Sequence, residues 1–72
     1  MNAMERPRVG RIVSYNAMDG VGRIELEDKS RVVFTHDALK GIGATHFGEV
    51  EVRMIRHDVD HGRRAFDVRA HH

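Results

Sequence analysis

Histidine and aspartate side chains gather in one short stretch near the C-terminal end of the chain. His57 and His61 flank Asp58 and Asp60, and imidazole and carboxylate groups are ligands that zinc accepts. The stretch lies in a predicted hairpin connection, where no helix would hold the ligands on one face, and a fixed metal site needs preorganised ligands. A polar hairpin tip explains the same residues. We therefore predict no metal site and no cofactor.

The other residues capable of chemistry do not form a catalytic pattern. The chain has no cysteine, and its two serines, Ser14 and Ser30, do not stand in a nucleophile-elbow motif. The carboxylates alternate with apolar residues, as solvated positions on strands do. Gly20 and Gly22 open a predicted strand rather than a helix, and no Lys-Ser/Thr pair follows them as in a phosphate-binding loop. We predict that the protein is not an enzyme.

Alternation of apolar and polar residues predicts an all-β fold of five short strands. We expect the strands over about 8–15, 20–27, 31–36, from Gly48 onward, and over 63–69. The segment 37–47 is the longest irregular stretch, and Asp37 could cap one helical turn there. Period-two placement predicts one shared core, formed by Ile12, Ile24, Leu26, Val33, Val50, Val52, Met54 and Val68.

Length and composition indicate one small domain. The chain has 72 residues and a formal net charge of +1, so its overall charge predicts no partner, and nucleic-acid binding would need local clustering of cations. No apolar run reaches the roughly 20 residues of a membrane span, and no signal-peptide core is present. We expect a cytoplasmic protein without membrane contact, with a lead-in over 1–7, a barrel over 8–70 and a tail over 71–72.

Three segments carry a resemblance to a known family. Gly10-Arg-Ile-Val-Ser-Tyr-Asn16 followed by Asp19-Gly-Val-Gly-Arg-Ile24 is similar to the first hairpin of small bacterial cold-shock domains, Gly-x-Val-x-Trp-Phe-Asn and Lys-Gly-Phe-Gly-Phe-Ile. Val33-Phe-Thr-His36 resembles that family's Val-Phe-Val-His-Phe, and Gly62-x-x-Ala65-x-x-Val68 resembles its closing segment. In this alignment one residue is missing after His36 and one after Gly48.

The resemblance implies a five-stranded antiparallel barrel of the oligonucleotide-binding (OB) type, which binds single-stranded DNA or RNA. Bases would stack on exposed rings while nearby cations follow the phosphates. Ser14 and Val21 stand where the family has rings, so we expect binding to be weak and sequence-neutral. The residues that the alignment assigns to nucleic-acid binding are Arg11, Tyr15, Arg23, Phe34 and His36.

Each assigned residue has an alternative role. Phe34 is exposed if Val33 and Thr35 point inward, which the alignment favours, and belongs to the core in the opposite register. Arg23 is either a contact to nucleic acid or a solvated arginine that pairs with an acid such as Glu25.

Tyr15 could cover the barrel end, and His36 could be an ordinary surface histidine. Val13 and Val21 would also suit an alternative function, a protein-interaction or assembly module, with a protein partner or a second copy of the chain, that has lost its stacking face.

Overall fold

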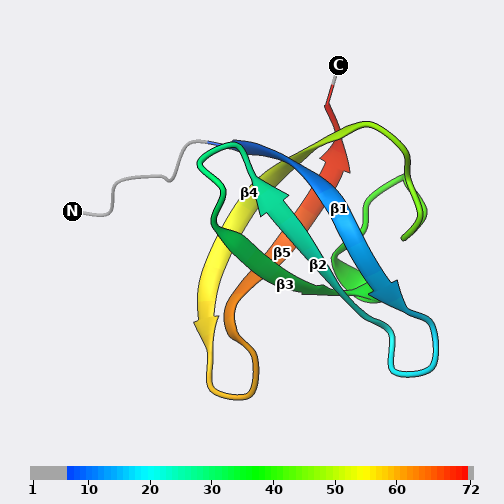
Figure 1. The fold of residues 1–72 in the computed structure, drawn as a ribbon. Helices are drawn as coiled ribbons and strands as arrows, with labels where there is room; N and C mark the ends of the chain where they lie inside the picture. Colours follow the sequence, from blue (N-terminus) through cyan, green and yellow to red (C-terminus); the bar gives the residue numbers. More distant parts are fainter. Residues whose placement is uncertain (1–6, 72) are drawn as a thin grey trace.

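The structure is a computed structural model that describes residues 7–71. The expected lead-in and tail therefore lie almost entirely outside the described residues. The elements in chain order are β1 (Arg8–Asn16), β2 (Val21–Leu26), β3 (Arg31–Thr35), the short 3₁₀ helix η1 (His36–Ala38), β4 (Glu49–Asp58) and β5 (Gly62–Ala70) (Figure 1). Among these residues no helix has the length and apolar character needed to cross a membrane.

The five strands close into a barrel in the order β1-β2-β3-β5-β4, with β4 returning to β1. This all-β architecture is consistent with the predicted OB-type barrel. The expectation of purely antiparallel pairing is wrong, because β3 and β5 run parallel, with Val33 opposite Arg64 and Phe34 opposite Ala65. The reason is geometric: strand directions cannot alternate all the way round a closed ring with an odd number of strands, so at least one pair must be parallel.

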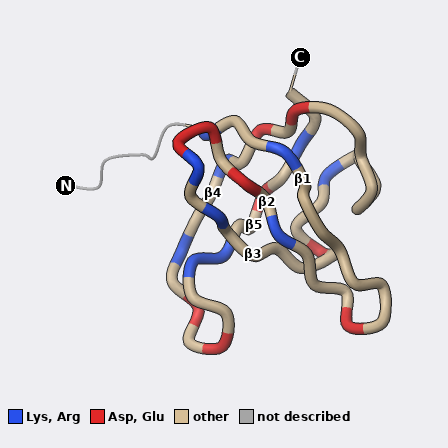
Figure 2. Tube along the Cα trace, viewed as in Figure 1, with Lys and Arg blue, Asp and Glu red and all other residues tan. Residues whose placement is uncertain are grey.

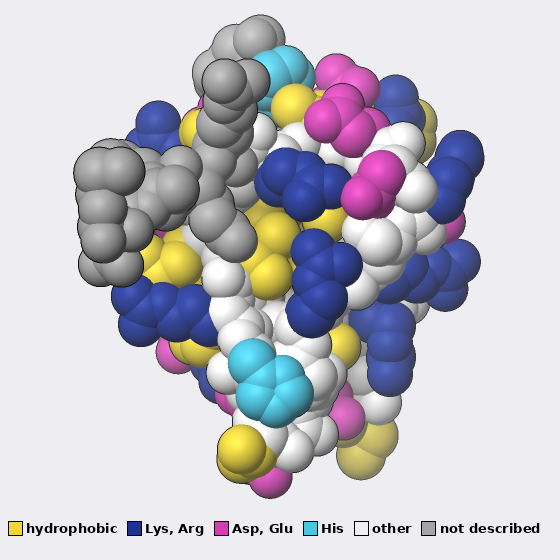
Figure 3. Space-filling view, turned by 90° about the vertical axis from the view of Figure 1, so that its left-hand side faces the viewer, with side chains coloured by type: hydrophobic (Ala, Val, Ile, Leu, Met, Phe, Trp, Pro, Cys, Tyr) yellow, Lys and Arg dark blue, Asp and Glu magenta, His cyan; other side chains and the backbone are white. Residues whose placement is uncertain are grey.

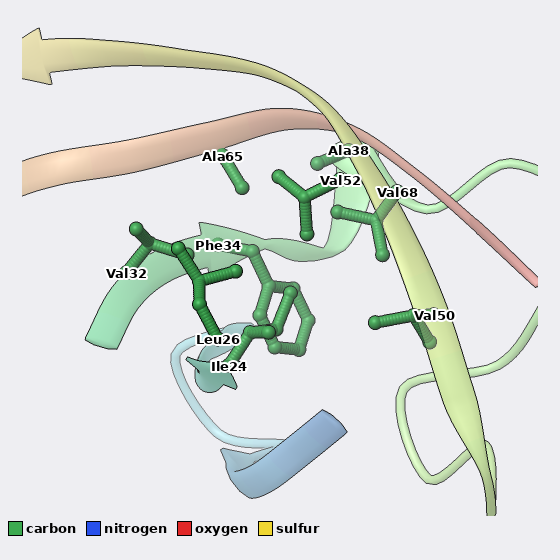
Figure 4. Packing of buried hydrophobic residues seen from close by; sticks show 9 residues of the cluster. All are labelled: Ile24, Leu26, Val32, Phe34, Ala38, Val50, Val52, Ala65 and Val68. Carbon is green, nitrogen blue, oxygen red and sulfur yellow. The ribbon is translucent and has the colours of Figure 1, made fainter. Parts of the chain in front are cut away.

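The core lies inside the barrel and is entirely hydrophobic among the described residues. Figure 4 shows its nine buried side chains: Ile24, Leu26, Val32, Phe34, Ala38, Val50, Val52, Ala65 and Val68. Five predicted core residues are buried as expected, and Ile12 packs against them while partly exposed. The prediction that Val33 and Met54 belong to the core is wrong, because Val33 is only half-buried and Met54 is exposed.

Strand register explains both errors. On β3, Val32 and Phe34 point inward, so the intervening Val33 faces outward. On β4, two irregularities flank Met54 in its pairing with β5. They leave the Met54 side chain 41% exposed and turn Ile55 toward the core instead.

A β-bulge in β1 sets the direction of Tyr15. Pairing with β2 shifts between Ile12 and Ser14, so Val13 has no partner of its own in that ladder. After the bulge, Tyr15 lies opposite Gly22 and its ring stacks on Phe34, with centroids 6.0 Å apart and an interplanar angle of 14°. Without the bulge, strict alternation would place Tyr15 on the outer surface.

The helical turn after β3 begins earlier than predicted. η1 spans His36–Ala38, and the residue before it is Thr35, so Asp37 lies within the first turn rather than capping it. The Thr35 hydroxyl donates a hydrogen bond to the Asp37 carboxylate. This contact ties the end of β3 to the turn.

Candidate functional site

The structure separates the residues that the sequence grouped as a nucleic-acid site. Arg11, Arg23 and His36 are exposed, on β1, β2 and the start of η1 respectively. Tyr15 is only half-exposed, because its ring covers Phe34 at the barrel interior. This agrees with the alternative role of Tyr15 as an aromatic residue that covers the core.

The predicted exposure of Phe34 is wrong. Its side chain is fully buried, and the ring lies over Gly22: a Cβ added to Gly22 would come within 2.5 Å of Cε1 and Cζ of Phe34. The missing side chain at Gly22 therefore provides the space that the ring occupies. No base can stack on Phe34 in this fold, and the outward positions of β3 are Arg31, Val33 and Thr35.

Outward-facing residues form a row across all five strands. Pairing places Ser14 opposite Arg23, Arg23 opposite Val33, Val33 opposite Arg64, and Arg64 opposite Arg56. We call Arg23, Arg64 and Arg56 the arginine row. Because neighbouring strands lie about 4.8 Å apart, the path from Ser14 to Arg56 covers about 19 Å along the curved barrel surface, and the arginine row from Arg23 to Arg56 covers about 14 Å of it. The alignment found only Arg23 of these three.

Arg64 is the most tightly held member of the row. Its Nη1 donates to Asp58 Oδ2 at 2.9 Å and its Nη2 donates to Thr35 Oγ1 at 2.8 Å, while Asp37 Oδ1 lies 3.7 Å from Nη2. Its guanidinium carbon is 4.5 Å from the centroid of the Phe66 ring, a cation–π contact. These contacts fix the side chain and partly neutralise its charge.

The Arg64 hydrogen bond is the main reason why the pKa of Asp58 is lowered to about 2, with backbone N–H groups of Asp60 and His61 acting in the same direction. Asp58 thus closes the β4–β5 hairpin and anchors Arg64. His61 Nδ1 lies 3.4 Å from Asp58 Oδ1, but within residues 7–71 no three His, Cys, Asp or Glu side chains are grouped so as to hold a metal ion.

Arg23 and Arg56 differ from Arg64, because neither forms an ion pair within the part of the chain that the structure describes. The acid proposed as an alternative partner for Arg23 is Glu25, which instead lies 3.6 Å from Arg31. Arg11 lies opposite Glu25 on the neighbouring strand. The guanidinium groups of Arg23 and Arg56 therefore remain available for an external anion.

The charges are distributed unevenly over the barrel. Figure 2 shows only acidic residues among the charged ones at the tips of the β1–β2 and β4–β5 hairpins, whereas both signs of charge occur on the strands and in the β2–β3 turn. On the side of the molecule where β4 and the start of β3 lie, Lys and Arg side chains stand next to a group of hydrophobic side chains (Figure 3). Cations and apolar groups therefore share this outer surface, although the formal net charge of the chain is only +1.

Sequence reasoning missed Phe66. Its register position on β5 falls between Ala65 and Asp67, where pairing with β4 shifts, and it shares the outer side with Arg64, which covers its ring. The available signal was the Arg64-x-Phe66 spacing, since residues two apart on a strand share a face. The ring is not an open stacking platform while Arg64 lies on it.

Comparison with known proteins adds no identification. No protein-family model matches the chain, and no curated protein matches its sequence.

Proposed function

We propose that this barrel binds single-stranded DNA or RNA weakly and without sequence preference, mainly through phosphate contacts to the arginine row. The observation that carries the proposal is that cross-strand pairing links Arg23, through Val33, to Arg64 and Arg56 on the outer side of β2, β3, β5 and β4. Guanidinium groups are suited to phosphate because they present several donors in a planar fork. Arg11 and His36, exposed near the same strands, extend the set of candidate contacts.

The geometry supports weak binding because no ring on β1–β3 is free to stack. Phe34 is buried and Tyr15 is stacked on it, and the family's remaining ring positions carry Ser14, Val21 and Arg23. Each base–aromatic stack is worth about 1–3 kcal/mol. The loss of three would remove about 3–9 kcal/mol if the effects were additive, against about 8 kcal/mol for a micromolar complex. What remains is largely electrostatic.

Salt dependence gives a quantitative test. For single strands the slope of log K against log salt is about −0.7 per neutralised phosphate. Two or three contacts from the arginine row then give a slope of about −1.4 to −2.1, so affinity should fall about 7- to 18-fold between 50 and 200 mM salt. Fluorescence anisotropy with a short labelled thymine-rich DNA and its uridine-rich RNA counterpart measures this slope directly.

Matched variants locate the site. The double variant Arg23→Gln, Arg56→Gln should flatten the salt slope and weaken binding, because both guanidinium groups face outward without ion pairs among the described residues. Lys29→Gln, in the β2–β3 turn, removes one positive charge away from the row and should have little effect. If Lys29→Gln weakens binding as much as the double variant, or if binding by the unmodified protein is tight and indifferent to salt, the arginine row is not the site.

A second candidate function is protein interaction, with a partner protein or a second copy of the chain. It is favoured by a hollow of about 250 Å³ beside β1, whose lining includes Val13, 45% exposed, and Phe47, 95% exposed. Beyond Arg11, β1 pairs only with β2, which leaves one strand edge without a ladder partner there. A concentration series by analytical ultracentrifugation, repeated with Phe47→Ser, tests assembly: a dimer lost in the variant would support this function.

We place nucleic-acid binding in the cytoplasm, and the lack of cysteine is compatible with a reducing compartment.

A further inference from the structure

A second cluster of cations surrounds a hollow elsewhere on the barrel. The hollow has a volume of about 360 Å³ and lies between the loop after η1 and the outer sides of β4 and β5. It shares no residue with the arginine row. Its lining is formed by Lys40, Gly41, Ile42, Glu51, Arg53, Arg69 and Ala70.

The fold brings three cations to this hollow from three separate segments. The loop after η1 lies beside β5, because the Lys40 N–H donates to the carbonyl of Val68 at 2.9 Å and Leu39 bridges to the same residue. On the other side of β5, Arg69 lies opposite Glu51 of β4. Lys40, Arg69 and Arg53 therefore meet from the loop, β5 and β4.

Donors remain available on each of these cations. Arg53 uses Nε for Glu51 Oε2 at 2.7 Å, and its two terminal nitrogens make no hydrogen bond within residues 7–71. Arg69 holds Asp67 through Nε at 2.9 Å and Nη2 at 3.4 Å, which leaves Nη1. Lys40 forms no ion pair within the described segment 7–71.

The balance of charge at the hollow is positive. The three cations and the two carboxylates of Glu51 and Asp67 have a formal net charge of +1. The Arg69 hydrogen bond holds the pKa of Asp67 below its ordinary value, and the charges of Arg69, Arg53 and Lys40 act in the same direction. All three cations line the same hollow.

We propose that this hollow binds the phosphate group of a small phosphorylated molecule. Two guanidinium groups and an ammonium supply charge-assisted donors from three sides. The volume is at the lower end of the roughly 300–1,000 Å³ typical of ligand sites, so it accommodates a phosphate and a small organic group. Glu51 lines the hollow and Asp67 pairs with Arg69. These two carboxylates confine the positive charge to a small area, which suits a compact anion better than an extended nucleic-acid strand.

Titration with inorganic phosphate, followed by amide chemical shifts at constant ionic strength, tests the site. We expect saturable shifts at the amides of Gly41, Ile42 and Ala70, and no such shifts with sodium chloride. Lys40→Gln should weaken phosphate binding by up to about fivefold, because it removes an exposed cation without breaking an internal ion pair. Arg63→Gln, which removes a positive charge on β5 outside the hollow, should leave the titration unchanged.

A variant that gains affinity makes the test sharper. Asp67→Asn removes a negative charge beside Arg69 and should tighten phosphate binding, whereas damage to the fold could only weaken it. Adenosine monophosphate should shift the same amides, and adenosine without phosphate should not. Linear, non-saturating shifts, equal weakening by Lys40→Gln and Arg63→Gln, or looser binding by Asp67→Asn would each overturn the proposal. None of these outcomes depends on whether the arginine row binds nucleic acid.

Discussion

Replacing Gly22 by alanine tests the central packing contact of the barrel. An added Cβ would stand 2.5 Å from two atoms of the Phe34 ring and 2.7 Å from the carbonyl oxygen of Ser14. The ring is enclosed by the core and the carbonyl belongs to the backbone of β1, so neither moves without disturbing the sheet. Overpacking of this kind typically costs about 1–3 kcal/mol.

The expected loss is large for a domain of this size. At about 0.05–0.15 kcal/mol per residue, 72 residues correspond to a free energy of unfolding of about 4–11 kcal/mol. In a small domain each 1 kcal/mol lowers Tm by about 4–8 °C, so Gly22→Ala should lower Tm by about 4–24 °C. Circular dichroism during heating, together with urea unfolding, measures both quantities.

Gly43→Ala is the matched control, since an added Cβ at Gly43 would meet nothing within 4 Å. It should change stability little. The double variant Gly22→Ala, Phe34→Leu should lose less stability than the sum of the losses in its two single variants. The smaller leucine removes the clash with the Phe34 ring, whereas the clash with the Ser14 carbonyl remains. If Gly22→Ala proves as stable as Gly43→Ala, the Phe34 ring does not lie over Gly22 and the exposed register of β3 must be reconsidered.

Three further outcomes follow from the same structure. Val52→Asp should abolish cooperative unfolding, because a buried carboxylate without a partner costs several kcal/mol; a folded variant would show that the inward register of β4 is wrong. The pKa of the Asp58 carboxyl is lowered to about 2. The ionised carboxylate therefore stabilises the fold fully at pH values above its ordinary pKa near 3.8, and this stabilisation is lost as the pH falls toward 2. The urea midpoint should drop over that pH interval, and it should drop less in Asp58→Asn. Val21→Phe and Val33→Phe place rings on the outer side of the barrel next to Arg23, and each should tighten binding to single strands about 5- to 150-fold if it adds one full stack; unchanged anisotropy titrations in both folded variants would move the nucleic-acid site away from β2 and β3.

The general fold was predictable from the sequence because each strand carries its own signal. The apolar alternation of Ile24 and Leu26, and of Val50 and Val52, correctly placed these residues inside. Turn residues separated the strands near their observed ends. The parallel pairing of β3 with β5 carries no such local signal, because it joins strands that no hairpin connects.

The register of β3 was the decisive error. Val32, Val33 and Phe34 are three apolar residues in succession, so period two does not determine which of them points inward. The alignment matched phenylalanine to phenylalanine and required a missing residue after His36. With a shift of one position, Val32-Val33-Phe34-Thr35-His36 matches Val-Phe-Val-His-Phe without that gap, and Val33 and Thr35 occupy the outward positions.

The candidate site was only partly predictable for a related reason. Arg23 could be found from the hairpin pattern of β1 and β2. Arg56 and Arg64 join it only through the β3–β5 and β4–β5 pairings, which depend on the closed barrel. The bulges near Val13 and Met54 likewise change which of the following side chains face outward. The apolar–polar alternation of the sequence gives no signal for either bulge.

The parallel pairing of β3 with β5 has a consequence for folding kinetics. Hairpins can form early because their partners are close in sequence, whereas the contact between Thr35 and Arg64 joins residues 29 positions apart. Closing a longer loop costs more chain entropy and slows folding, so this pairing should form after the hairpins, as should the pairing of β1 with β4, whose partners lie still farther apart in sequence. In a partly folded chain with only β1–β3 assembled, Arg23 would be in position, but Arg64 and Arg56 would not yet lie beside β3. Under the proposed function, binding to a labelled single strand would then require the closed barrel, and an anisotropy signal recorded during refolding should lag behind the earliest formation of β-structure.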